Sequence, residues 1–155
     1  MHKVLFTIGF ACQIFYFGSR YGVKLEKDIT EAILCVGMND STWEFLLWLG
    51  IPDKMTGFEL LGETLEQSME YVRKGRKINQ TDIFISLSKR HGQSYNSIDR
   101  AIRRAVDFAA YRTDETAKRN LCEVMGNVYY GSVSVKSFLY AAAGWLLKHE
   151  GEIEI

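Results

Sequence analysis

The sequence predicts an all-α fold: a compact helical bundle of about six helices containing a helix-turn-helix, with a short N-terminal appendage whose structure the pattern does not define. Apolar residues recur at helical spacing after residue 40, and no strand alternation recurs there. Of the 155 residues, 47% are hydrophobic and one is proline, so the chain can bury a core without disulfides or metals. These features divide it into an appendage (1–39), a helical domain (40–150) and an acidic tail (151–155).

The appendage contains an apolar run from Val4 to Phe17. This run is shorter than the roughly 17–25 residues that span a bilayer, and no convincing cleavage site for a secretory signal follows it. It therefore predicts a buried helix or strand, or a remnant of a lost upstream domain, and no association with a membrane. Cys12, Cys35 and Cys122 are far apart and odd in number, which indicates a reducing, cytoplasmic compartment.

The first helix of the domain is expected in the segment STWEFLLWLG, which ends at Gly50. Asp40 or Ser41 can cap it, and Glu44 follows Ser41 by three residues, as in a capping box. A second helix is expected over 57–73, and a basic loop, RKGRKIN, follows it.

The third and fourth helices have the spacing of a helix-turn-helix. The third is expected to run from Thr81 or Asp82 to His91, and Ser94 caps the fourth. The spacing of Ser88, Gly92 and Ile98 supplies a small residue, a glycine for a left-handed turn and an apolar plug between the helices. Such a unit places its second helix in the major groove of DNA.

The fourth helix separates into two faces. Its apolar half contains Ile98, Ala101, Ile102, Ala105, Val106, Phe108 and Ala109; its polar half contains Asn96, Ser97, Asp99, Arg100, Arg103, Arg104 and Asp107. A surface helix with i,i+4 ion pairs would show the same pattern. The turn spacing and the preceding Lys89 and Arg90 favour DNA binding.

Charge is unevenly distributed along the chain, although the net charge is zero. Residues 71–120 hold 12 Lys+Arg and 5 Asp+Glu, so this middle section carries +7 (12 − 5) and the remainder −7. A basic patch is what binding to phosphates requires.

Two more helices are expected after the fourth, over 114–124 and 134–149, with a loop between them. The last is apolar nearly all round, with Phe138 and Trp145 prominent, so either the core or a partner subunit must cover it.

With these residues in view, the chain resembles the C-terminal effector domain of the sporulation master regulator of endospore-forming bacteria, stage 0 sporulation protein A. The likeness covers about Asp40 to Glu150. The segment SIDRAIRRAVDFAAYR (97–112) is close to the family's recognition helix, LGIPDKMTGFELL (49–61) is similar to its Ile-Gly-Val-Pro segment, and FLYAAAGWLLKHE (138–150) matches its last helix in pattern. Full-length members also carry a phosphoacceptor receiver domain, which 39 residues cannot form.

The resemblance implies a sequence-specific transcription regulator that reads a short TGNCGAA-type box on double-stranded DNA through a recognition helix in the major groove. Arg100 is then expected to bind a guanine and Asp99 a cytosine amino group. The full expected set of DNA-binding residues is Lys89, Arg90, Gln93, Ser94, Asn96, Ser97, Asp99, Arg100, Arg103, Arg104 and Arg112. The sigma subunit of RNA polymerase is a further partner that the resemblance suggests.

Several positions depart from the family pattern. His91 stands where the family has an aromatic residue, Arg104 replaces its usual histidine, Ser97 replaces a basic residue, and Asp99 replaces a glutamate. His91 alters the apolar plug of the first motif helix. Arg104 adds a positive charge and Ser97 removes one, and Asp99 keeps the acceptor but shortens its reach.

An alternative is a receiver-less interaction protein that pairs with and modulates a full-length regulator through the last helix, as a heteromer. The same helix could also form a homodimer of this chain. The apolar Phe138 and Trp145 motivate it. An enzyme is not expected, because His2, His91 and His149 have no companions at metal or triad spacing and no glycine-rich phosphate loop is present. No cofactor and no metal site are predicted.

Overall fold

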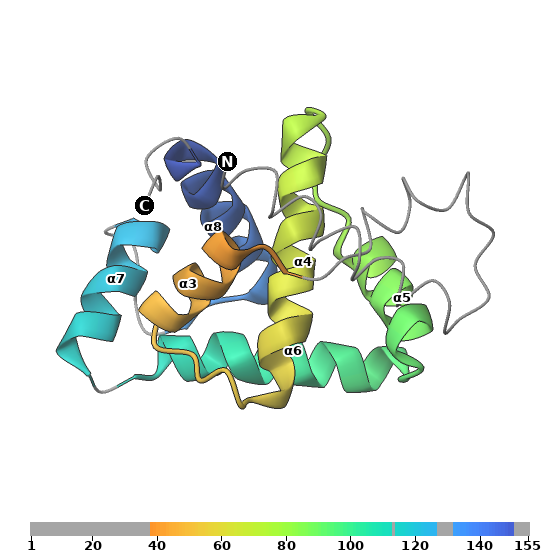
Figure 1. The fold of residues 1–155 in the computed structure, drawn as a ribbon, viewed down its shortest axis with the longest axis horizontal. Helices are drawn as coiled ribbons and strands as arrows, with labels where there is room; N and C mark the ends of the chain where they lie inside the picture. The colour runs from red at the N-terminus through yellow and green to blue at the C-terminus, as the bar shows by residue number, and fades with distance from the viewer. Residues whose placement is uncertain (1–37, 113, 127–131, 151–155) are drawn as a thin grey trace, which may run out of the picture. The chain divides into compact units, whose positions relative to one another are not determined.

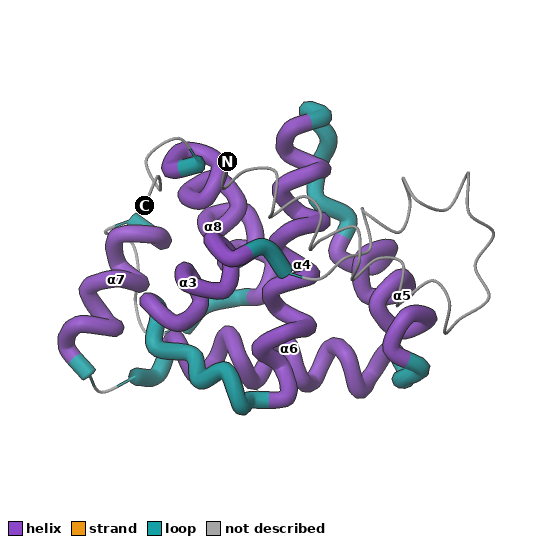
Figure 2. Tube along the Cα trace, viewed as in Figure 1, coloured by secondary structure: helices purple, strands orange, loops and turns teal. Residues whose placement is uncertain are grey.

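The fold is all-helical in the part that the computed structural model describes, which is residues 38–112, 114–126 and 132–150. Six helices follow one another: α3 (Asp40–Trp48), α4 (Thr56–Arg73), α5 (Gln80–His91), α6 (Tyr95–Ala110), α7 (Glu115–Met125) and α8 (Val135–His149) (Figure 1). Loops join them, and no strand occurs in the described ranges (Figure 2). The predicted fold class is therefore confirmed. The apolar run over 4–17, two of the three cysteines, the tail and most of the loop over 127–134 lie outside the described residues.

The longest helix, α4, is the centre of the bundle. It packs against α6 along one side and α8 along another (Figure 1). Each fully buried leucine or phenylalanine in such a core contributes about 1.5–3 kcal/mol relative to an exposed one. The fully buried side chains of these three helices include Phe58, Leu61, Leu65, Ile98, Ile102, Phe138 and Leu139. The core therefore fixes α6 against the centre of the bundle by one face only.

A glycine permits the contact between α4 and α6. A Cβ at Gly57 would lie 2.1 Å from the carbonyl oxygen of Ala101 and 3.1 Å from the Cβ of Ala105. Only a residue without a side chain allows two helix backbones to approach so closely. Gly57 therefore determines how near α6 lies to the first turn of α4.

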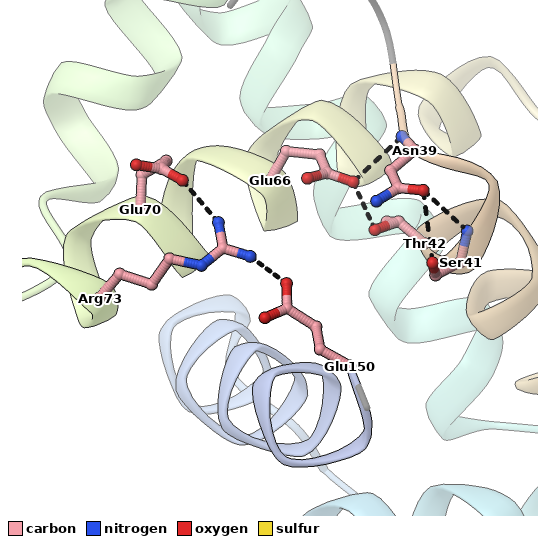
Figure 3. A network of polar contacts seen from close by, with 7 residues as sticks. All are labelled: Asn39, Ser41, Thr42, Glu66, Glu70, Arg73 and Glu150. Carbon is pink, nitrogen blue, oxygen red and sulfur yellow. Dashed lines mark hydrogen bonds and ion pairs between the residues drawn. The ribbon is translucent and has the colours of Figure 1, made fainter. Parts of the chain in front are cut away.

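The start of α3 differs from the sequence prediction. The N-cap is Asn39, whose side chain accepts a hydrogen bond from the amide of Ser41 at 3.2 Å, so neither Asp40 nor Ser41 is the cap. Glu66 of α4 accepts from the Asn39 amide at 3.1 Å and from the Thr42 hydroxyl at 2.5 Å (Figure 3). The predicted capping box did not identify this acceptor, because the carboxylate comes from a different helix.

The apolar last helix is covered by the core. Phe138 is fully buried, and Trp145 stacks against Trp48 with ring centroids 5.0 Å apart and lies 5.2 Å from Phe45. Of the two covers that the sequence allowed, the core and not a partner subunit therefore covers Phe138, because α4 and α7 both pack against α8.

Arg73, the last residue of α4, lies between two glutamates. Its guanidinium donates to Glu70 on its own helix and to Glu150 at the end of α8 (Figure 3). Partial burial opposes the charged form of Arg73, but the hydrogen bond with Glu70 and the charge of Glu150 outweigh it, so the pKa of Arg73 is raised. This contact joins the C-terminal ends of α4 and α8.

The helix α7 packs through its polar residues as well as its apolar ones. Asp114 caps its start by accepting from the amide of Ala117 at 3.0 Å, and Gly126 ends it with a positive φ of 73°. The side-chain amide of Asn120 is almost buried and donates to the carbonyl of Trp48 at 2.8 Å. That bond connects α7 with the end of α3.

Candidate nucleic-acid interface

The turn between α5 and α6 has the geometry that the sequence predicted. Gly92 ends α5 in the left-handed region, with φ 61° and ψ 29°. The Ser88 carbonyl accepts from the amide of Gln93 at 3.2 Å, and the Ser88 hydroxyl donates back to the Gln93 carbonyl. Ser94 then caps α6 by accepting from the amide of Ser97 at 3.2 Å. Ser88 therefore closes the turn with hydrogen bonds, in addition to being small.

The two faces of α6 are separated as predicted. Its buried residues are Ile98, Ile102, Ala105, Val106, Ala109 and Ala110, and its exposed ones include Asn96, Ser97, Arg100, Arg103 and Arg104. In Figure 1, α6 runs across the lower part of the described bundle, and the first turns of α4 cross it. Its polar face is therefore accessible over much of the helix length.

Three of the predicted cations, Lys89, Arg100 and Arg104, make neither an ion pair nor a side-chain hydrogen bond with any described residue. Lys89 lies in the last turn of α5, and all three are exposed. Asn96, Arg100 and Arg104 follow at intervals of four, so they form one strip along α6. This strip offers unneutralised positive charge beside the N-terminus of α6.

Other predicted residues of α6 contact one another. Nη2 of Arg103 lies 3.2 Å from Oδ1 of Asp99, an i,i+4 ion pair. The Ser97 hydroxyl donates to Oε1 of Gln93 at 3.3 Å. Both contacts are exposed and therefore weak, so each can exchange for a contact with a ligand.

Arg90 and His91 both contact one carboxylate on α4. Nη1 of Arg90 lies 3.1 Å from Oε2 of Glu63, and Nε2 of His91 lies 2.9 Å from its Oε1. Only 14% of the Glu63 side chain is exposed. His91, which stands where the family has an aromatic residue, has a partly exposed ring that bonds to Glu63 of α4. No local pattern indicated Glu63, because it is 28 residues from His91 in the chain.

Arg112, also in the predicted set, is partly buried after the end of α6. Its Nη1 donates to the carbonyl of Gly50 at 3.0 Å, and its guanidinium lies 5.2 Å from the centre of the Phe108 ring. The side chain therefore holds the loop after α3 against α6.

The described residues contain no group of histidine, cysteine and acidic side chains that could hold a metal ion. None of their helices combines the length and the apolar character needed to cross a bilayer.

Comparison with known protein families identifies this arrangement. Residues 42–133 match the family model described as "Sporulation initiation factor Spo0A C terminal". The chain belongs to that family. Neither a curated protein nor a solved structure matches the chain significantly. The Spo0A C-terminal match begins within α3 and includes all of α4, α5, α6 and α7, so it contains the whole helix-turn-helix.

The resemblance that the sequence suggested is therefore confirmed. The Spo0A C-terminal domain is a DNA-binding effector domain of sporulation regulators, and it is a regulatory domain and not a class of enzyme. DNA is accordingly the partner that the family supports.

Proposed function

We propose that this chain is a sequence-specific transcription regulator that reads a TGNCGAA-type box by placing α6 in the major groove of double-stranded DNA. The observation that carries the proposal is the strip of exposed, unpaired cations on a helix that begins immediately after a left-handed glycine turn. A major groove about 12 Å wide accepts one α-helix, and the residues nearest its N-terminus reach the base edges.

Arg100 is the proposed base-reading residue. It is exposed, has no carboxylate partner among the described residues and lies in the second turn of α6. A guanidinium can donate two parallel hydrogen bonds to O6 and N7 of guanine. Asp99 is proposed to accept from a cytosine amino group, because a carboxylate bound to Arg103 still has acceptor positions free. Asn96, Ser97 and Arg103 are proposed to read adjacent bases or phosphates.

Lys89 and Arg104 are the proposed phosphate-binding residues. Both are exposed and lie beside the turn or on the outer strip of α6. Gln93 and Ser94, at the turn itself, are proposed to contact the backbone there. Arg90 and Arg112 are less suited to this task, because their guanidinium groups already bind Glu63 and Gly50. The proposed interface therefore depends on α6 and on Lys89.

A cytoplasmic location and contact with the sigma subunit of RNA polymerase are part of this proposal. The cysteine pattern and the family both support the location, and the contact derives from the family.

The test is fluorescence anisotropy of the purified chain on a duplex that contains the box and on a scrambled duplex, at several salt concentrations. The proposal expects tight binding that weakens with salt and that prefers the box. Weak binding with no preference for the box would contradict it.

The alternative, an interaction protein that pairs through α8, has less structural motivation than the sequence suggested. Phe138 is fully buried and offers no free apolar surface, whereas Trp145 stacks against Trp48 and is only partly exposed. Light scattering of the chain mixed with a full-length homologue tests it, and the formation of a heteromer would support it.

A further inference from the structure

Glu63 is an acidic residue beside a DNA-binding motif, a position where a carboxylate would repel phosphate. It lies on α4, and only 14% of its side chain is exposed. Its Oε2 is shielded from solvent and accepts no hydrogen bond from the described residues, so the ion pair with Arg90 at 3.1 Å is what balances its charge. An ionised carboxylate in such a place requires a nearby cation.

The two basic side chains that contact Glu63, Arg90 and His91, are adjacent in the last turn of α5, where Lys89 is also located. Arg90 and His91 bend towards α4, whereas Lys89 is exposed and has no ion-pair partner among the described residues. His91 donates from Nε2 to Oε1 at 2.9 Å, because an ionised carboxylate can only accept. Within this turn, Arg90 and His91 therefore contact Glu63, whereas Lys89 is exposed to solvent.

We propose that Glu63 is a positioning residue of the DNA interface: it keeps Arg90 on α4 and away from phosphate, so that Lys89 is the phosphate-binding cation of this turn. This inference rests on the proposed function. A guanidinium paired with a carboxylate has no net charge to exchange for the counterions of DNA. A phosphate that approached Arg90 would also meet the negative charge of Glu63. The ion pair therefore limits the affinity for DNA of any sequence, and the residues of α6 determine the preference for the box.

The experiment measures the slope of log K against log salt on a scrambled duplex for the wild type and four variants. Glu63→Gln should make the slope steeper by about 0.9, the value of one additional phosphate contact, because Arg90 is released. Arg90→Gln alone should leave the slope unchanged. Arg90→Gln combined with Glu63→Gln should return the slope to the wild-type value.

Lys89→Gln is the matched control from the same turn, and it should make the slope shallower by about 0.9. Circular dichroism establishes that each variant is folded. A general loss of structure would weaken binding, but it would not make the slope steeper in Glu63→Gln and return it to the wild-type value in the double variant. If Glu63→Gln does not fold, the inference is tested by the salt slope of Arg90→Gln alone, and a slope equal to that of the wild type supports it.

A shallower slope for Arg90→Gln would overturn the inference, because it would mean that Arg90 already contacts phosphate. An unchanged slope in folded Glu63→Gln would also overturn it, while the proposed function would stand. If the wild type fails to bind either duplex, the proposed function fails, and this inference fails with it.

Discussion

Two arginines on the polar face of α6 and three arginines elsewhere in the domain differ in what holds their side chains. Arg100 and Arg104 extend from the exposed face of α6 and have no ion-pair partner among the described residues. Arg73, Arg90 and Arg112 bind, in turn, two glutamates, a shielded carboxylate and a backbone carbonyl. Some arginine side chains therefore connect helices of the domain, and others remain available to bind a ligand. The variants below separate the two kinds.

The largest expected effect is that of Arg100→Ala. This change should remove about 1–3 kcal/mol of discrimination between the box and a scrambled duplex, because a bidentate contact with guanine is lost. Weak non-specific binding should remain. Anisotropy titrations measure the ratio of the affinities for the two duplexes. An equal loss of affinity on both duplexes would show that Arg100 does not read a base.

Arg112→Met should act on stability. The loss of a charged hydrogen bond to the Gly50 carbonyl is expected to lower the free energy of unfolding by about 1–3 kcal/mol. Urea denaturation measures this, and the salt dependence of DNA binding should not change in the folded fraction. A shallower salt slope at unchanged stability would instead place Arg112 in the DNA interface.

Lys89→Ala and Arg104→Ala should each make the salt dependence of binding shallower by about 0.9, because each removes one phosphate contact. Both residues are exposed, so stability should change little. Titrations at several salt concentrations provide the slopes. A slope equal to that of the wild type would remove the residue concerned from the list of phosphate contacts.

Arg73→Ala should have the smallest effect. Its ion pairs are largely exposed, and such pairs contribute at most about 1 kcal/mol. The residue also lies about 24 Å along α4 from Gly57, where α6 is in contact, so DNA binding should not change. Thermal unfolding measures the change in stability, and anisotropy measures the DNA affinity. A changed DNA affinity would contradict the distinction between arginines that connect helices and arginines that bind DNA.

The elements whose signals are local in sequence could be predicted. Gly92 and Ser94 are recognisable because a left-handed turn and an N-cap favour few residue types. The two faces of α6 follow from the periodicity of a helix. The existence and order of the six helices therefore agreed with the prediction, with boundaries that differed by a residue or two.

What could not be predicted depends on partners that are distant in sequence. Arg90 and Arg112 have the same residue type as Arg100, and their partners are on other elements. The burial of Phe138 follows from the packing of neighbouring helices and not from the composition of α8. Periodicity indicates that a face is apolar or charged, but it contains no information on what covers that face.

The carboxylate of Glu66 at the start of α3 has a consequence for how the domain opens. Because the backbone amide of the N-cap residue Asn39 and the Thr42 hydroxyl both donate to Glu66, the beginning of α3 is bound to α4 in addition to being capped by Asn39. The first turn of α3 should consequently exchange its amide hydrogens together with α4, as one cooperative unit, and not by independent fraying. A peptide of α3 alone should have little helix in water, since nine residues without tertiary support are too few.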